Sequence, residues 1–181
     1  IYTLQAMQVD VFVMRDAEPG LPAYVAQHVA PHVSVLNAGE AHVSHPTQGL
    51  LDVLTIRQRK QQIAGLTVTI VGDILHSRVA RSNLHGLRTL GAKVRLCGPP
   101  TLLPQEFAAL GAELYFDLAS AVRDADVVMM LRIQRERQDG NYFPTVDEYA
   151  HYFCLTEEML AEAKPDVIIL HPGPMNRGIE I

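Results

Sequence analysis

The feature that most constrains this chain is a repeated alternation between short apolar runs and helical segments after residue 60. The apolar runs are Thr67–Val71, Lys93–Cys97, Leu114–Phe116, Val127–Leu131 and Val167–Leu170. Helical segments are expected between them, from Ser77 to Gly91, Pro104 to Leu110, Ala119 to Arg123 and Thr156 to Ala163. Strands that alternate with helices favour a mainly parallel, doubly wound α/β sheet.

A second unit of the same kind precedes this region, and the sequence contains only part of it. Val9–Met14 is predicted to be a buried strand, Leu21–His28 a helix and Val33–Leu36 another strand. We expect two doubly wound parallel-sheet domains, the first incomplete. The predicted domains are residues 1–51 and 52–181, joined by a linking helix at about 46–62.

The linking helix has its polar chemistry at the amino end. Pro46 suits the first turn, because its missing N–H has no partner there. An apolar stripe is predicted from Leu50, Leu51, Val53 and Leu54. His45, Thr47 and Gln48 stand where unpaired N–H groups face outward, which favours an anionic ligand.

Composition excludes several functional classes. The 181 residues are 48% hydrophobic and 19% charged, as in ordinary globular proteins. A net charge of -5 disfavours non-specific nucleic-acid binding. No apolar run reaches membrane-spanning length, and Cys97 and Cys154 lack metal-ligand spacing, so we expect a reduced, cytoplasmic setting. The chain begins at Ile1 without Met, and we expect it to be an internal portion of a longer polypeptide.

Cationic side chains follow predicted strands. Arg15 and Asp16 are expected just beyond the first strand, Arg78 follows the Thr67–Val71 strand, and Arg132 with Gln134 follows Val127–Leu131. The carboxyl edge of a parallel sheet is where ligands bind. Arginine holds carboxylates and phosphates with paired hydrogen bonds, so a substrate with several negative charges is indicated.

Other chemistries have weaker support. The turn after the Thr67–Val71 strand lacks the GxGxxG pattern of dinucleotide binding, and there is no GxSxG nucleophile motif. His42 and His45 have no accompanying metal-ligand pattern. We therefore expect no metal and no cofactor.

Taken in order, several stretches resemble the aspartate carbamoyltransferase catalytic chains. These stretches are Val9–Arg15, His45–Asp52, Gly72–Asn83, Leu131–Arg137 and His171–Gly178. The resemblance implies carbamoyl transfer from carbamoyl phosphate to the α-amino group of L-aspartate, in pyrimidine synthesis. It also implies homotrimers with shared active sites, and the final stretch resembles a bacterial subgroup that assembles with dihydroorotase or an inactive relative of it.

The resemblance carries roles onto matching residues. Arg15 and His45 would polarise the carbonyl group of carbamoyl phosphate, and Gln48, Gly173 and Pro174 would also contact that substrate. Arg78, Arg132 and Gln134 would bind the carboxylates of L-aspartate. No covalent intermediate is implied.

Two alternatives remain open. Ornithine carbamoyltransferases are similar, but two arginines suit a dicarboxylate better than a cationic amino acid. A non-catalytic homologue of the same fold is the other alternative, because Glu40–Ser44 departs from the family pattern. A glycine expected in that loop is replaced, which puts any positive φ there in doubt.

Overall fold

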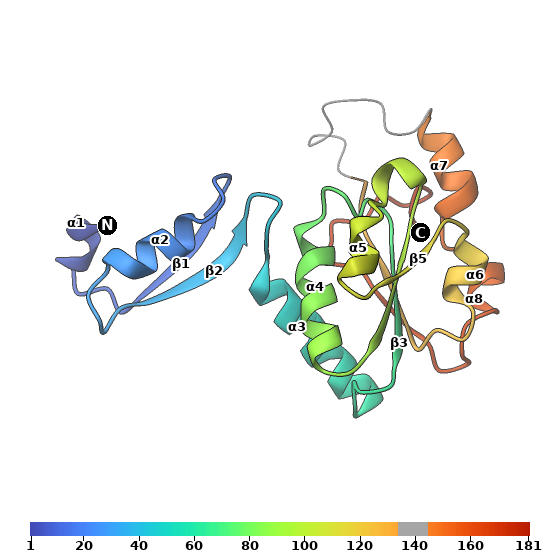
Figure 1. Ribbon diagram of the computed structural model, residues 1–181, viewed down its shortest axis with the longest axis horizontal. Coiled ribbons are helices and arrows are strands. Elements are labelled where there is room, and N and C mark those ends of the chain that lie inside the picture. Colours follow the sequence, from blue (N-terminus) through green and yellow to red (C-terminus); the bar gives the residue numbers. More distant parts are fainter. Residues whose placement is uncertain (134–144) are drawn as a thin grey trace.

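The computed structural model describes residues 1–133 and 145–181, and within them two parallel sheets lie on either side of a connecting helix (Figure 1). The amino-terminal part contains α1 (Tyr2–Gln5), β1 (Val11–Asp16), α2 (Leu21–His28) and β2 (Ser34–Glu40). Helix α3 (Pro46–Lys60) packs against α4 and also contacts β2, so it touches both parts. The α/β class and the parallel sheets predicted from the alternation are confirmed.

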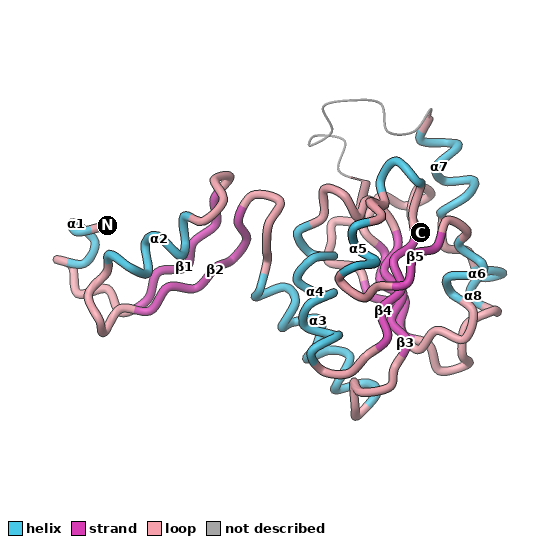
Figure 2. The backbone as a smooth tube through the Cα atoms, in the orientation of Figure 1, coloured by secondary structure: helices cyan, strands magenta, loops and turns pink. Residues whose placement is uncertain are grey.

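The carboxyl-terminal part is built around five parallel strands in the order β5-β4-β3-β6-β7 (Figure 2). Its elements follow in chain order as β3 (Thr67–Val71), α4 (Arg78–Thr89), β4 (Lys93–Cys97), η1 (Pro100–Leu102), α5 (Glu106–Ala109), β5 (Glu113–Tyr115), α6 (Leu118–Val122), β6 (Val127–Met130), α7 (Val146–Phe153), α8 (Glu157–Leu160) and β7 (Ile168–Leu170).

Alternate residues of the central strands feed two separate apolar clusters. Val68 and Ile70 of β3 pack on one face with residues of α3, α4 and α5. Val71 packs on the other face with residues of α6 and α7. Because both faces of the sheet are covered, β6 is apolar throughout and every one of its residues is buried.

The strand order places a switch point between β3 and β6. From β3 the chain moves outward through β4 and β5, then returns to add β6 and β7 on the other side. The loops after β3 and β6 therefore leave the sheet in opposite directions and open a crevice at the carboxyl edge.

The first part differs from expectation in its strands. β1 extends to Asp16, so Arg15 lies within the strand and not beyond its end. The expectation of a buried strand is wrong, since Val11 is 46% and Val13 67% exposed. Helix α2 covers one face of this sheet, and these side chains lie on the other. β2 is longer than predicted and reaches Glu40.

The apolar stripe predicted for the linking helix is buried only in part, since Val53 packs against the core. Leu50 is 69% exposed, and Leu51 and Leu54 are exposed as well. The face turned toward α4 instead buries Asp52 and Ile56. On this face Ile56 and the partly buried Val53 pack into the apolar cluster that includes residues of α4, and Asn83 of α4 donates a 2.7 Å hydrogen bond to Asp52. The helix ends at Lys60, before the predicted boundary at 62.

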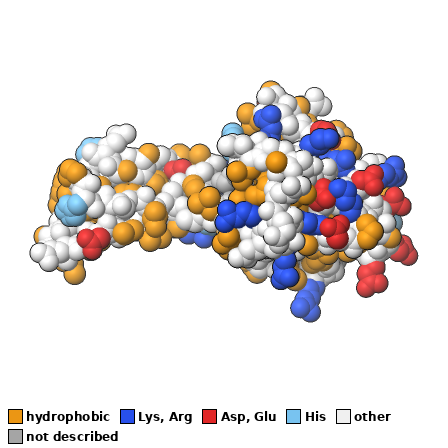
Figure 3. All heavy atoms as spheres, turned by 90° about the horizontal axis from the view of Figure 1, so that it is seen from below, with side chains coloured by type: hydrophobic (Ala, Val, Ile, Leu, Met, Phe, Trp, Pro, Cys, Tyr) orange, Lys and Arg blue, Asp and Glu red, His pale blue; other side chains and the backbone are white. Residues whose placement is uncertain are grey.

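Charge is unevenly spread between the two parts. In the space-filling view, Lys, Arg, Asp and Glu side chains gather on the carboxyl-terminal part, whereas the amino-terminal part shows mainly apolar and uncharged atoms on this face (Figure 3). Along the described residues, no helix is long and apolar enough to cross a membrane.

Candidate functional site

Most of the predicted site residues meet at one cavity of about 220 Å³ between the two parts. Arg15 comes from β1, His45 and Gln48 from the start of α3, and Arg78 from the start of α4. Arg132 follows β6, and Pro172, Gly173 and Pro174 follow β7. Residues far apart in the sequence are therefore gathered at the carboxyl edge of both sheets, where the switch point lies. Gln134 lies outside the described residues.

Sequence reasoning missed several residues that line this cavity. They are Ser77, Val79, Leu131 and Pro172. Each is next to a predicted residue in the chain and lies within one of the stretches that carry the family resemblance, so both signals could have found them. Ser77 also caps α4, since its hydroxyl accepts a hydrogen bond from the Ala80 N–H at 3.1 Å.

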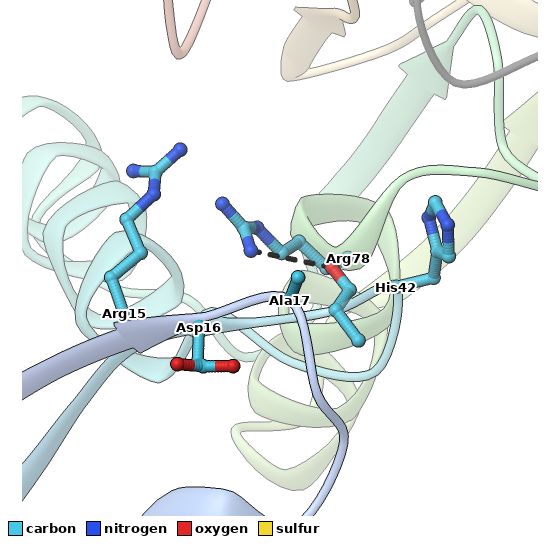
Figure 4. Close-up of a pocket in the computed structure, with 6 residues that line it drawn as sticks. Arg15, Asp16, Ala17, His42 and Arg78 are labelled. Carbon is cyan, nitrogen blue, oxygen red and sulfur yellow. Dashed lines mark hydrogen bonds between the residues drawn. The ribbon is translucent and has the colours of Figure 1, made fainter.

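A second, neighbouring cavity of about 430 Å³ shares Arg15 and Arg78 with the first. In Figure 4 the side chains of Arg15, Arg78 and His42 extend toward the same side, whereas Asp16 points the other way. His42 was not predicted to line a site. Its ring meets the ring of His76 edge-on at 6.1 Å, which joins the loop before α3 to the loop before α4.

Arg78 is held by the loop that departs from the family pattern. Its Nη1 donates a 3.3 Å hydrogen bond to the Ala41 carbonyl (Figure 4), and only 5% of the residue is exposed. Ala41 keeps a positive φ of 40° although it has a side chain. In the same loop Gly39 has a φ of 121°, which favours glycine, and a Cβ there would lie 2.8 Å from Arg78 Cζ.

His45 is fixed as a neutral ring that caps α3. Its Nδ1 accepts a hydrogen bond from the Gln48 N–H at 3.4 Å, so the ring proton resides on Nε2. Burial lowers the pKa of His45 below its ordinary 6.5, and the positive charges of Arg78 and Arg15 lower it further. A neutral imidazole therefore keeps an N–H donor for a ligand at neutral pH.

Gln48 is oriented by a buried carboxylate. Its Nε2 donates a 2.9 Å hydrogen bond to Asp52, which also accepts from Asn83 at 2.7 Å. Burial raises the pKa of Asp52, and these two hydrogen bonds oppose that shift. The Gln48 side chain is thus tied to the contact between α3 and α4.

The cavity has the chemistry of a site for polar anions. Three arginines and a neutral histidine supply donors, and no Asp or Glu is among the described residues that line this cavity. In the ranges 1–133 and 145–181, no group of three or more His, Cys, Asp or Glu side chains is arranged to hold a metal ion.

Comparison with known proteins assigns both parts of the chain to one family. The family model for the aspartate/ornithine carbamoyltransferase carbamoyl-P binding domain matches residues 1–58, and that for the Asp/Orn binding domain matches residues 64–181. An aspartate carbamoyltransferase catalytic subunit of Heliobacterium modesticaldum is 56% identical over 179 residues, which cover 99% of this chain and 57% of that protein.

Solved structures of both activities share the fold. An aspartate transcarbamoylase from Trypanosoma cruzi, in complex with N-(phosphonacetyl)-L-aspartic acid, has a TM-score of 0.81 at 30% identity, covering 99% of this chain and 58% of that one. An ornithine carbamoyltransferase from Pyrococcus furiosus has a TM-score of 0.79 at 29% identity, covering 98% of this chain and 58% of that one. The chain thus spans somewhat more than half the length of these relatives. With both domain models matched in order along its length, the chain belongs to the aspartate/ornithine carbamoyltransferase family.

Proposed function

We propose that the protein transfers the carbamoyl group of carbamoyl phosphate to the α-amino group of L-aspartate. The observation that carries this proposal is the single cavity where Arg15, His45, Arg78 and Arg132 meet from four separate elements. The 56% identity to an aspartate carbamoyltransferase catalytic subunit supports it. The products would be N-carbamoyl-L-aspartate and phosphate, early in pyrimidine synthesis.

The site residues divide by the charge they would meet. Arg15 and the Nε2–H of His45 would donate to the carbonyl oxygen of carbamoyl phosphate, where negative charge develops as the amine attacks. Gln48, Gly173 and Pro174 would contact the same substrate. The amine adds to the carbonyl carbon to form the new C–N bond, and the C–O bond to phosphate then breaks as the departing phosphate takes the amine proton. Orientation and electrostatics therefore suffice without a covalent bond to the protein.

Two arginines favour L-aspartate as the acceptor over a cationic amino acid. Arg78 and Arg132 lie on either side of the switch point, after β3 and β6. Each can form paired hydrogen bonds to one carboxylate, and a second carboxylate distinguishes aspartate from ornithine. Gln134 is proposed to assist them.

The test is phosphate release from carbamoyl phosphate by the full native protein, with L-aspartate or L-ornithine as acceptor. We expect an aspartate-dependent rate that collapses in Arg132→Ala. Turnover with ornithine alone would contradict the acceptor. A folded protein that neither turns over nor binds a bisubstrate phosphonate would instead support the non-catalytic alternative.

We further propose a homotrimer with shared active sites, in the cytoplasm, within a larger assembly that includes dihydroorotase or a related chain. We also propose that the boundary between the two domains lies between residues 51 and 52. Light scattering of the native protein, purified with and without the dihydroorotase chain, tests the assembly. Bare trimers in both samples would count against the larger complex.

A further inference from the structure

A buried carboxylate lies behind the loop that follows β7. Glu180 has none of its surface exposed, and its Oε1 is 3.2 Å from His171 Nε2, while the His171 side chain is only 5% exposed. The same oxygen accepts a 2.6 Å hydrogen bond from the Asn176 N–H. Because an unpaired buried carboxylate is costly, these contacts hold Glu180, His171 and Asn176 together.

The hydrogen bonds determine which nitrogen of His171 carries the proton. The Gly173 N–H donates to His171 Nδ1 at 2.9 Å, so Nδ1 must have a free lone pair. The proton therefore resides on Nε2 and is donated to Glu180. One ring thus connects the buried carboxylate to the backbone of Gly173.

That backbone belongs to the wall of the candidate site. Pro172, Gly173 and Pro174 line the cavity that also contains Arg78 and Arg132. Gly173 is exposed, with a φ of 67°, and a Cβ built on it would meet no atom within 4 Å. Gly173 has no side chain to anchor it, and the hydrogen bond to His171 ties its backbone N–H in place.

We propose that Glu180 and His171 are positioning residues that hold the 172–174 loop against carbamoyl phosphate. The inference rests on the proposed function, since that function gives the loop its ligand. Neither side chain lines the cavity, so both act through Gly173. Loss of the His171 acceptor frees the loop and weakens carbamoyl phosphate binding, with little change in the binding of L-aspartate.

The test uses paired variants of the full native protein. His171→Asn places a carbonyl oxygen near the former Nδ1 and keeps the acceptor for Gly173, whereas His171→Ala removes it. We expect His171→Ala to raise the KM for carbamoyl phosphate about tenfold, the effect of one lost hydrogen bond. His171→Asn should restore part of this loss, because it keeps the acceptor for Gly173 but lacks the Nε2–H that contacts Glu180. His151→Ala, at an exposed histidine of α7, should change nothing.

Two measurements do not depend on turnover. Nitrogen-15 NMR should show His171 as the neutral Nε2–H tautomer, and a ring protonated at Nδ1 overturns the proposal. Calorimetry with phosphonoacetamide, a stable analogue of carbamoyl phosphate, should follow the same order of affinities as the KM values. If the wild-type protein binds this analogue but does not use L-aspartate, the proposal of L-aspartate as the acceptor is wrong. The affinities of the variants for the analogue still test the positioning role.

Other outcomes also count against the inference. A folded His171→Ala protein with an unchanged KM and affinity overturns it. If both His171→Asn and His171→Ala unfold, the acceptor for Gly173 has not rescued the protein. His171 then contributes to stability, and the positioning role is overturned.

Discussion

Replacing His45 with asparagine separates two roles of that side chain. In the structure, Nδ1 caps α3 by accepting the Gln48 N–H, which leaves the Nε2–H available to the cavity. Asparagine is among the best helix caps, because its short carbonyl accepts the same backbone hydrogen bond. It does not reach as far as Nε2. His45→Asn should therefore keep the cap and lose the proposed donor to the carbonyl oxygen.

The two effects have different magnitudes. Loss of one donor to a developing oxyanion lowers kcat by about 10²–10³, or roughly 2.7–4 kcal/mol. His45→Ala loses the cap as well as the donor, and loss of the cap costs about 1 kcal/mol of stability. For a domain of about 150–250 residues that corresponds to a decrease in Tm of about 2–4 °C.

Steady-state carbamoyl transfer and thermal unfolding of the native protein measure both effects. His45→Asn should match wild type in Tm and lose activity, whereas His45→Ala should lose both. A kcat within about threefold of wild type in His45→Asn would refute the role of Nε2–H as the donor. An equal fall in Tm for both variants would refute the capping argument.

The pKa of His45 adds a pH dependence with a definite sign. The folded chain holds this proton less tightly than the unfolded chain, because burial, Arg78 and Arg15 lower the pKa below 6.5. The contribution to stability is fully present above pH 6.5 and is lost as pH falls through the lowered value. Wild type should therefore lose stability on acidification through this range, and His45→Asn should lose less.

Three further changes test the surroundings of the cavity. Ala41→Gly should stabilise the protein by about 0.5–1 kcal/mol in urea unfolding, because it relieves a side chain held at a φ of 40°; destabilisation would contradict that strain. Gly39→Ala places a Cβ 2.8 Å from Arg78 Cζ, so the guanidinium should move and the KM for L-aspartate should rise about tenfold or more. An unchanged KM would show that Arg78 does not bind L-aspartate. Asp52→Ala should cost about 1–3 kcal/mol of stability and raise the KM for carbamoyl phosphate, since Asn83 and Gln48 lose their shared acceptor; unaltered urea unfolding would show that this acceptor is dispensable.

Local signals predicted many elements correctly. β3 and β4 have the predicted bounds, because each is a short run rich in β-branched or alternating apolar residues between turn signals. The start of α3 at Pro46 and the cap of α4 at Ser77 also follow from residue type alone. These features depend on a few neighbouring residues.

Predictions about which face is buried were less successful. The leucines of α3 have helical spacing, but Asp52 and Ile56 face α4 instead. Helix α7 was not predicted, although Tyr149 and Phe153 are buried against the second cluster. A helix can bury any face that finds a partner, and only the packed structure supplies that partner.

The sequence by itself determined the strand–helix alternation, the helix caps and the ordered motifs, since each is written in residues close together in the chain. The tertiary structure decided what those motifs form together. Arg15, His45, Arg78, Arg132 and Gly173 reach one cavity only because parallel strands align their carboxyl ends at one edge. The tautomers of His45 and His171 likewise depend on which N–H groups meet their Nδ1 atoms, and that is a property of the folded backbone.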